Sequence, residues 1–341
     1  AGRARAVEAI EQSEYVGPAP VPLAAFEAQI LKQRLEQEAL DFEMLSRGLS
    51  HLTLPKALVD RMGTALSSQR PILMYGPPGN GKSSISRAAA NCFHQMIYLP
   101  RCIEVDGQVI KIFDPTIHKE LAIESEQAGF VDGSAVRHST NDPRWVCCRR
   151  PFVATGVELT LDMLDLNFHP RAHFYDAPLQ LKASGGVLFV DDFGQQLARP
   201  IEILNRWNVP LEHGADYLTL ETGRKFACAF DVQLIFSTNL PLENVMDNEI
   251  MRRIPYRIQI EPPAQDEFND LLERECADRD LCLPENLRAY LVDELYAAES
   301  RPFARYHPRF IVEHVIANAK FNRCPPRFSR EILSEAMQDL F

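Results

Sequence analysis

The sequence predicts an α/β fold: a three-layer domain with a parallel sheet, followed by a small helical lid domain. Three short, mainly apolar runs, at residues 71–75, 187–190 and 232–237, have the length and hydrophobic character of buried strands. A glycine-rich turn and an alanine-rich helical stretch follow the first run. From Pro262 onward the pattern is helical, with a break near residue 301. Buried strands and helices in this arrangement indicate a layered α/β domain with a helical unit after it.

Before the first apolar run, the sequence predicts helices and a linker. Residues 1–13 are predicted as a short charged helix, which three prolines between residues 18 and 22 end, because proline lacks the amide donor. Residues 23–48 are predicted as a further helix and residues 54–66 as an amphipathic one. The predicted domains are residues 1–49 (N-terminal helical and linker segment), 50–260 (α/β domain) and 261–341 (helical lid).

Between the first two apolar runs, the sequence predicts a helix, a pair of strands and a loop. Residues 83–93 are predicted to be helical because they are rich in alanine. Residues 97–113 alternate in strand fashion, and Asp106 and Gly107 in their middle are a hairpin signal. Residues 114–144 are polar and are predicted to form a loop.

The composition argues against several functional classes. Of the 341 residues, 46% are hydrophobic and 24% charged, as in ordinary globular proteins. The net charge of -11 argues against a broad, non-specific grip on nucleic acid, although a local basic patch is compatible with it. No apolar run approaches the roughly 20 residues of a membrane span, and no signal peptide is visible. The eight cysteines contain no C-x-x-C pair, which favours the reduced thiols of a cytoplasmic protein over a metal site.

The most specific motif is G-x-x-x-x-G-K-[ST], which residues 76–83 match between a strand and a helix. Glycines let backbone amides turn toward phosphates without a Cβ in the way, and the next helix presents its positive end to them. Lys82 would reach the β- and γ-phosphates of ATP, and the Ser83 hydroxyl would bind Mg²⁺. The predicted nucleotide-binding residues are Gly76, Pro77, Pro78, Gly79, Asn80, Gly81, Lys82, Ser83 and Ser84. The alternative is a chance glycine-rich turn.

The other two apolar runs end in residues suited to phosphoryl chemistry. Residues 187–190 deliver Asp191 and Asp192 to the end of a strand. Asp191 would bind the metal with Ser83, and Asp192 would orient and polarise the attacking water. The third run leads to Asn239, which could hold that water between the γ-phosphate and Asp192. The alternatives are an acidic turn and a turn-forming Asn at the ends of core strands.

In this order, the three strands resemble the Walker A, Walker B and sensor 1 strands of AAA+ ATPases. Residues 183–194 are similar to the Walker B region of bacterial enhancer-binding ATPases. The strand-like residues 217–230 lie where those ATPases, and the MoxR-type chaperone ATPases, carry a β-hairpin before sensor 1. Over residues 50–341 the chain most resembles uncharacterised, chaperone-like bacterial AAA+ ATPases.

The resemblance implies roles for two arginines and singles out one departure. Arg253, favoured over Arg252, lies after sensor 1, where AAA+ proteins place the arginine finger that acts on the neighbouring subunit's ATP. Arg309 lies where the lid carries sensor 2, which touches the γ-phosphate. The alternative for each is a solvated surface arginine. Most AAA+ members have Glu in place of Asp192. Asp is one methylene shorter, so the attacking water would have to sit closer here or be reached differently.

Other sequence features give weaker expectations. Arg149 and Arg150 are expected to lie on a solvated face. His169 and His173 are four residues apart, but the proline between them argues against a helical metal pair. Residues 161–175 fall where enhancer-binding ATPases carry a substrate-contacting loop, without sharing its motif.

As a whole, the resemblance implies a Mg-ATP-hydrolysing ATPase that forms a homo-oligomeric ring and remodels a protein partner. The alternative function is a slow ATP-dependent switch or a DNA-associated regulator. Residues 1–9 faintly resemble the tail of a winged-helix module, so nucleic acid could be bound through a module before residue 1.

Overall fold

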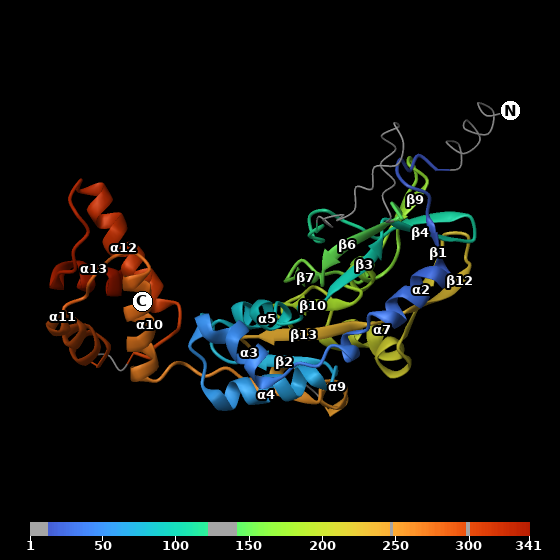
Figure 1. The fold of residues 1–341 in the computed structure, drawn as a ribbon. Helices are drawn as coiled ribbons and strands as arrows, with labels where there is room; N and C mark the ends of the chain where they lie inside the picture. Colours follow the sequence, from blue (N-terminus) through green and yellow to red (C-terminus); the bar gives the residue numbers. More distant parts are fainter. Residues whose placement is uncertain (1–12, 122–141, 246–247, 298–300) are drawn as a thin grey trace, which may run out of the picture.

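A computed structural model of the chain describes residues 13–121, 142–245, 248–297 and 301–341 (Figure 1). Residues 1–12 of the predicted N-terminal helix and most of the predicted loop at residues 114–144 lie outside the described residues.

A parallel five-stranded sheet forms the centre of the molecule, in the order β14-β2-β13-β10-β7. The three strands predicted from the apolar runs are β2, β10 and β13, and all three are confirmed. Because β13 lies between β2 and β10, the polar residues after these strands meet at one edge of the sheet. The strand bounds are β2 Ile72–Tyr75, β7 Phe152–Thr155, β10 Gly186–Val190, β13 Val232–Thr238 and β14 Tyr256–Gln259.

Helices cover both faces of this sheet, which gives the three predicted layers. Alternate residues of β2 belong to different apolar clusters: Ile72 and Met74 pack with α3, α4 and α5, whereas Leu73 packs with α7, α8 and α9. This alternation is the period of two expected for a strand that is buried on both faces. The helix bounds are α3 Phe42–Leu49, α4 Lys56–Ser67, α5 Lys82–Ala90, α7 Pro200–His213, α8 Leu242–Val245 and α9 Asn248–Arg253.

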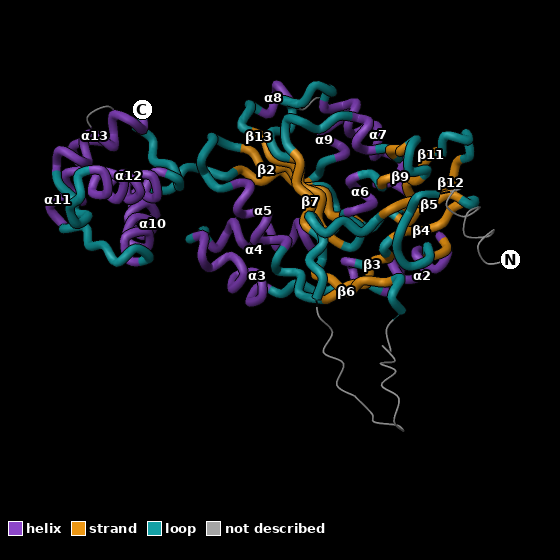
Figure 2. The backbone as a smooth tube through the Cα atoms, turned by 90° about the horizontal axis from the view of Figure 1, so that it is seen from above, coloured by secondary structure: helices purple, strands orange, loops and turns teal. Residues whose placement is uncertain are grey.

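A second, mixed sheet lies beside the first, in the order β1-β4-β5-β9-β8 (Figure 2). The predicted hairpin turn is present between β4 and β5, where Asp106 and Gly107 have φ of 56° and 78°, as a tight hairpin requires. Helix α2 packs on this region with two antiparallel pairs, β3–β6 and β11–β12. The bounds are β1 Val21–Pro22, α2 Leu23–Lys32, β3 Met96–Pro100, β4 Cys102–Val105, β5 Gln108–Lys111, β6 Trp145–Arg149, β8 Asn167–His169, β9 Phe174–Asp176, α6 Leu179–Lys182, β11 Ala215–Thr219 and β12 Lys225–Ala229.

Two sequence expectations were wrong in the region that joins the sheets. The predicted helix at residues 23–48 is instead α2, a short 3-10 turn at Leu35–Gln37, and α3. The turn forms because the Glu38 carboxylate is buried, accepts the amide hydrogens of His94 and Gln95, and pairs with Arg150 (Nε–Oε2 2.7 Å). Arg150 is therefore 8% exposed rather than solvated, whereas Arg149 is exposed as expected.

The C-terminal helices have a core of their own and lie apart from the sheets in both views (Figures 1 and 2). The break expected near residue 301 is confirmed, because residues 301–306 carry no helix. The bounds are α10 Gln265–Ala277, α11 Glu285–Ala289 with a π-helical continuation at Tyr290–Tyr296, α12 His307–Phe321 and α13 Arg330–Leu340. In the described part of the chain, no helix combines the length and apolar character that crossing a membrane requires.

Candidate active site

The loop between β2 and α5 has the backbone that the glycine-rich motif predicts. Gly76, Gly79 and Gly81 all have positive φ, at 142°, 74° and 84°. A Cβ on Gly76 would lie 2.2 Å from the carbonyl oxygen of Ile260, so a side chain could not be added without moving the backbone. Gly81 is also the residue that precedes the first turn of α5, so this loop leads directly into the positive end of a helix.

Lys82 points back into this loop. Its Nζ donates to the carbonyl oxygens of Gly76 (2.8 Å) and Pro77 (2.9 Å), and also to the Asn239 side-chain oxygen. The residue is 6% exposed, and this burial lowers the pKa of its ammonium group, although the charges of Asp191 and Asp192 act in the opposite direction.

The predicted metal and catalytic side chains meet at the same place. The Ser83 hydroxyl donates to Asp191 Oδ2 at 2.7 Å, and Asn239 Nδ2 donates to Asp192 Oδ1 at 2.9 Å. Because Asn239 also accepts from Lys82, one continuous chain of hydrogen bonds joins the three strand ends. Hydroxyl and carboxylate oxygens are the ligands that Mg²⁺ prefers, so Ser83 and Asp191 suit a magnesium ion bound with nucleotide phosphates.

Asp192 lies in an unusual backbone conformation. Its φ of 49° is in the left-handed region, which Asp and Asn adopt more readily than other non-glycine residues. The loop after it is held by two backbone bonds, Phe193 N to the Ser237 oxygen (2.7 Å) and Gln195 N to the Asp192 oxygen (2.9 Å). The turn thereby aims the Asp192 carboxylate at Asn239.

Two polar residues that the sequence did not indicate support this loop. Ser237, in β13, donates its hydroxyl hydrogen to Asp191 Oδ1. Gln196 donates from Nε2 to the backbone oxygens of Asp191 (2.9 Å) and Gly156 (3.2 Å), and so ties the loop to the end of β7. A hydroxyl directly after the three apolar residues 234–236 was the available signal for Ser237, whereas nothing in the sequence singles out Gln196.

The C-terminal region reaches the glycine-rich loop through residues that precede α12. Tyr306 N donates to the Gly79 oxygen (3.2 Å), and Arg305 N donates to Asn80 Oδ1 (3.2 Å). The Arg305 guanidinium also donates to the Thr53 oxygen at 2.8 Å. Arg309, the predicted lid residue, has a side chain that is 66% exposed and pairs with Glu313 at 2.7 Å.

The predicted arginine finger lies at the end of α9. Arg253 donates to Asn205 Oδ1 of α7 at 2.6 Å, on the opposite face of the central sheet from α5. Its neighbour Arg252 is exposed. Both arginines therefore belong to a different layer of the molecule from the helix that follows the glycine-rich loop.

The weaker expectations lie elsewhere in the fold. His169 pairs with Asp176 (2.7 Å), and no group of three or more His, Cys, Asp or Glu side chains that could hold a metal ion occurs in the described ranges. Residues 161–175 form a 3-10 turn at Leu161–Leu164, β8 and the start of β9.

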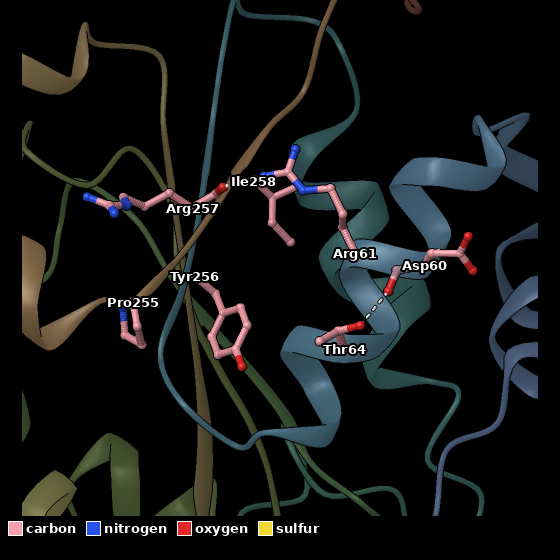
Figure 3. A pocket seen from close by; sticks show the side chains of 7 residues that line it. All are labelled: Asp60, Arg61, Thr64, Pro255, Tyr256, Arg257 and Ile258. Atoms are coloured by element: carbon pink, nitrogen blue, oxygen red, sulfur yellow. Dashed lines mark hydrogen bonds between the residues drawn. The ribbon is translucent and has the colours of Figure 1, made fainter.

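A separate hollow of about 320 Å³ lies between α4 and β14, where Tyr256 extends toward Thr64 (Figure 3). Arg61 donates to the backbone oxygen of Arg257 there (2.8 Å), which covers the edge of the sheet.

The parallel sheet, the glycine-rich loop and the helix after it define a P-loop NTPase fold. NtrX from Brucella abortus has this fold in its complex with ATP, with a TM-score of 0.51 at 13% identity, covering 93% of this chain and 61% of NtrX. The complex of NtrX with ADP gives a TM-score of 0.50 at 15% identity, covering 86% and 57%. The chain thus spans about three fifths of the length of NtrX, and at this identity the likeness concerns the fold alone.

A second solved structure and one protein family also match this chain. The RuvB Holliday junction branch migration motor of Thermotoga maritima gives a TM-score of 0.47 at 11% identity, covering 88% of this chain and 74% of RuvB. Residues 264–339, which hold the C-terminal helices, match a family described as "Domain of unknown function (DUF8689)". No curated protein sequence matches the chain.

Proposed function

We propose that the protein is an AAA+ ATPase that hydrolyses Mg-ATP. The observation that carries this proposal is the connected set of side chains at the ends of three neighbouring strands. Ser83 contacts Asp191, while Lys82, Asn239 and Asp192 form one hydrogen-bonded chain. A chance glycine-rich turn would not need a lysine, a hydroxyl, two carboxylates and an amide to converge on it.

In this proposal, each residue has a separate task. Lys82 and the loop amides hold the phosphates, and Asp192 accepts a proton from a water that Asn239 orients. Ser83 and Asp191 hold Mg²⁺, which when bound neutralises charge on the phosphates. Arg305 and Tyr306 connect the lid to the loop, so the lid is placed to respond to what the loop binds.

We further propose that the protein works as a cytoplasmic homo-oligomeric ring and remodels a protein partner in the manner of a chaperone. Arg253 would complete the active site of a neighbouring subunit, and Arg309 would approach a phosphate when the lid moves. The β11–β12 hairpin lies immediately before β13, which supports kinship with the ATPases that carry a hairpin at this point. We also propose that the chain consists of three parts: residues 1–49, the α/β domain at residues 50–260 and the helical lid at residues 261–341.

A second candidate function is a slow ATP-dependent switch or DNA-associated regulator. Asp192 favours it, because its carboxylate accepts a hydrogen bond from Asn239 and its backbone has a left-handed conformation. A group held in this way polarises water less readily. The dependence of ATPase rate on protein concentration separates the candidates, because a motor completed by a neighbour's arginine gains specific activity as it assembles.

The nucleotide assignment is tested with Lys82→Ala. We expect ATP affinity, measured by calorimetry, to fall about 100-fold or more, because charged hydrogen bonds to the phosphates are lost. Lys320→Ala, which removes an exposed lysine in α12, is the matched control and should bind like the wild type. Wild-type affinity in a folded Lys82→Ala variant would remove the basis for assigning residues 76–83.

A further inference from the structure

Ser237 is a polar residue in β13, a strand whose residues are all buried. Residues 234–236 of β13 are apolar and buried, and Ser237 is 0% exposed. A buried hydroxyl is costly unless it is hydrogen-bonded, so a serine here needs a partner. That partner is the carboxylate of Asp191, on the neighbouring strand end.

The two oxygens of Asp191 have separate partners. Oδ1 accepts from the Ser237 hydroxyl and from the backbone amide of Asp192 (3.0 Å). Oδ2 accepts from the Ser83 hydroxyl (2.7 Å), on the side where the metal would bind. Two donors on Oδ1 prevent the carboxylate from rotating, and this keeps Oδ2 turned toward Ser83.

We propose that Ser237 is a positioning residue, which orients Asp191 so that Oδ2 binds Mg²⁺ together with Ser83. This inference rests on the proposed Mg-ATP function. Residues that hold a metal-binding carboxylate in place contribute to metal affinity although they do not touch the metal. The Ser237 hydroxyl orients Asp191, whereas the Ser237 backbone carbonyl accepts from Phe193 N and holds the loop.

The test compares nucleotide binding with and without magnesium in Ser237→Ala. Calorimetry with a non-hydrolysable ATP analogue should give wild-type affinity in EDTA. The Mg²⁺ concentration that gives half of the metal-dependent gain in affinity should rise about 10- to 100-fold. Ser184→Ala is the matched control, because it also removes a buried hydroxyl, which donates to Leu181 rather than to Asp191, and it should behave like the wild type.

A double-mutant cycle tests whether Ser237 acts through Asp191. Asp191→Ala alone should lose the magnesium response, and adding Ser237→Ala to it should change nothing further. Should Ser237→Ala not fold, Ser237→Cys keeps a similar volume with a weaker donor, and we expect an intermediate magnesium requirement.

Two results would overturn the role of Ser237 alone. The first is a magnesium requirement in Ser237→Ala, or in Ser237→Cys, that equals that of the wild type. The second is a loss of nucleotide affinity in the variant that is equal with and without the metal. Absence of nucleotide binding by the wild-type protein would instead overturn the proposed function, and the role of Ser237 with it.

Discussion

At the scale of single residues, the backbone conformation at position 192 limits which side chains fit there. A residue with φ of 49° is strained unless it is Gly, Asn or Asp, whose short polar side chains tolerate the left-handed region. Glu at this position would place its carboxylate one methylene farther out and would fit this backbone less well. The departure from the Glu of most AAA+ ATPases is therefore consistent with the local turn.

Replacing Asp192 by Asn separates binding from hydrolysis. Asn keeps the backbone conformation and can still accept the hydrogen bond from Asn239, but it cannot take a proton from water. We expect Asp192→Asn to bind Mg-ATP within about twofold of the wild type and to lose about 10²–10⁴ in turnover. Calorimetry and phosphate release measure the two quantities. Turnover at the wild-type rate would show that Asp192 is not the catalytic carboxylate.

Sequence alone predicted the residues of the site whose spacing is local. Residues 76–83 form one contiguous motif, Asp191 and Asp192 come at the end of an apolar run, and Asn239 lies three residues after Phe236. Arg305 was missed because its contacts next to the site are with Asn80 and Thr53, more than 200 positions away along the chain. No periodicity or spacing records such contacts, since they arise only when the segment before α12 folds back against residues 53 and 79–80.

At the scale of elements, the segment between α2 and α3 shows how tertiary contacts override helical periodicity. The buried strands were predictable because a short, mainly apolar run bounded by turn residues is typical of a strand in the core. Residues 33–38 had the composition of a helix, but Leu35 N bonds to Asp231 and Glu38 pairs with Arg150. Burial raises the pKa of Asp231, because it disfavours the charged form of this carboxylate.

The Glu38–Arg150 pair should therefore matter for stability. Arg150→Ala leaves a buried carboxylate without its counter-charge, and we expect a loss of about 3–5 kcal/mol in the free energy of unfolding. Denaturant titration followed by circular dichroism measures it. The control Arg149→Ala removes the exposed neighbour and should stay within about 0.5 kcal/mol.

A double variant distinguishes the lost charge pairing from simple loss of bulk. Glu38→Gln combined with Arg150→Met removes both charges and keeps most of the volume, so it should recover much of the stability lost in Arg150→Ala. An Arg150→Ala protein as stable as the wild type would mean that the pair contributes nothing to holding residues 33–38 against the core.

At the scale of the whole molecule, the fold puts Arg253 and the glycine-rich loop in different layers. The loop leads into α5 on one face of the sheet, whereas Arg253 ends α9 on the other and is held by Asn205 of α7. In the proposed ring, Arg253 would act on the ATP of a second subunit. We therefore expect Arg253→Ala to bind ATP normally and to lose roughly 10³–10⁵ in hydrolysis. Arg252→Ala, at the exposed neighbour, is the control.

Mixing two inactive variants shows whether Arg253 acts between subunits. Arg253→Ala retains an intact loop and Lys82→Ala retains an intact arginine, so each alone should be inactive for a different reason. In a mixed assembly, an Arg253→Ala subunit that holds ATP can lie beside a Lys82→Ala subunit that supplies the missing guanidinium, and part of the activity should return. The return should depend on the mixing ratio, because only one of the two possible neighbour orders is productive. Mixed oligomers, verified by affinity tags, that stay inactive would place the action of Arg253 within its own subunit.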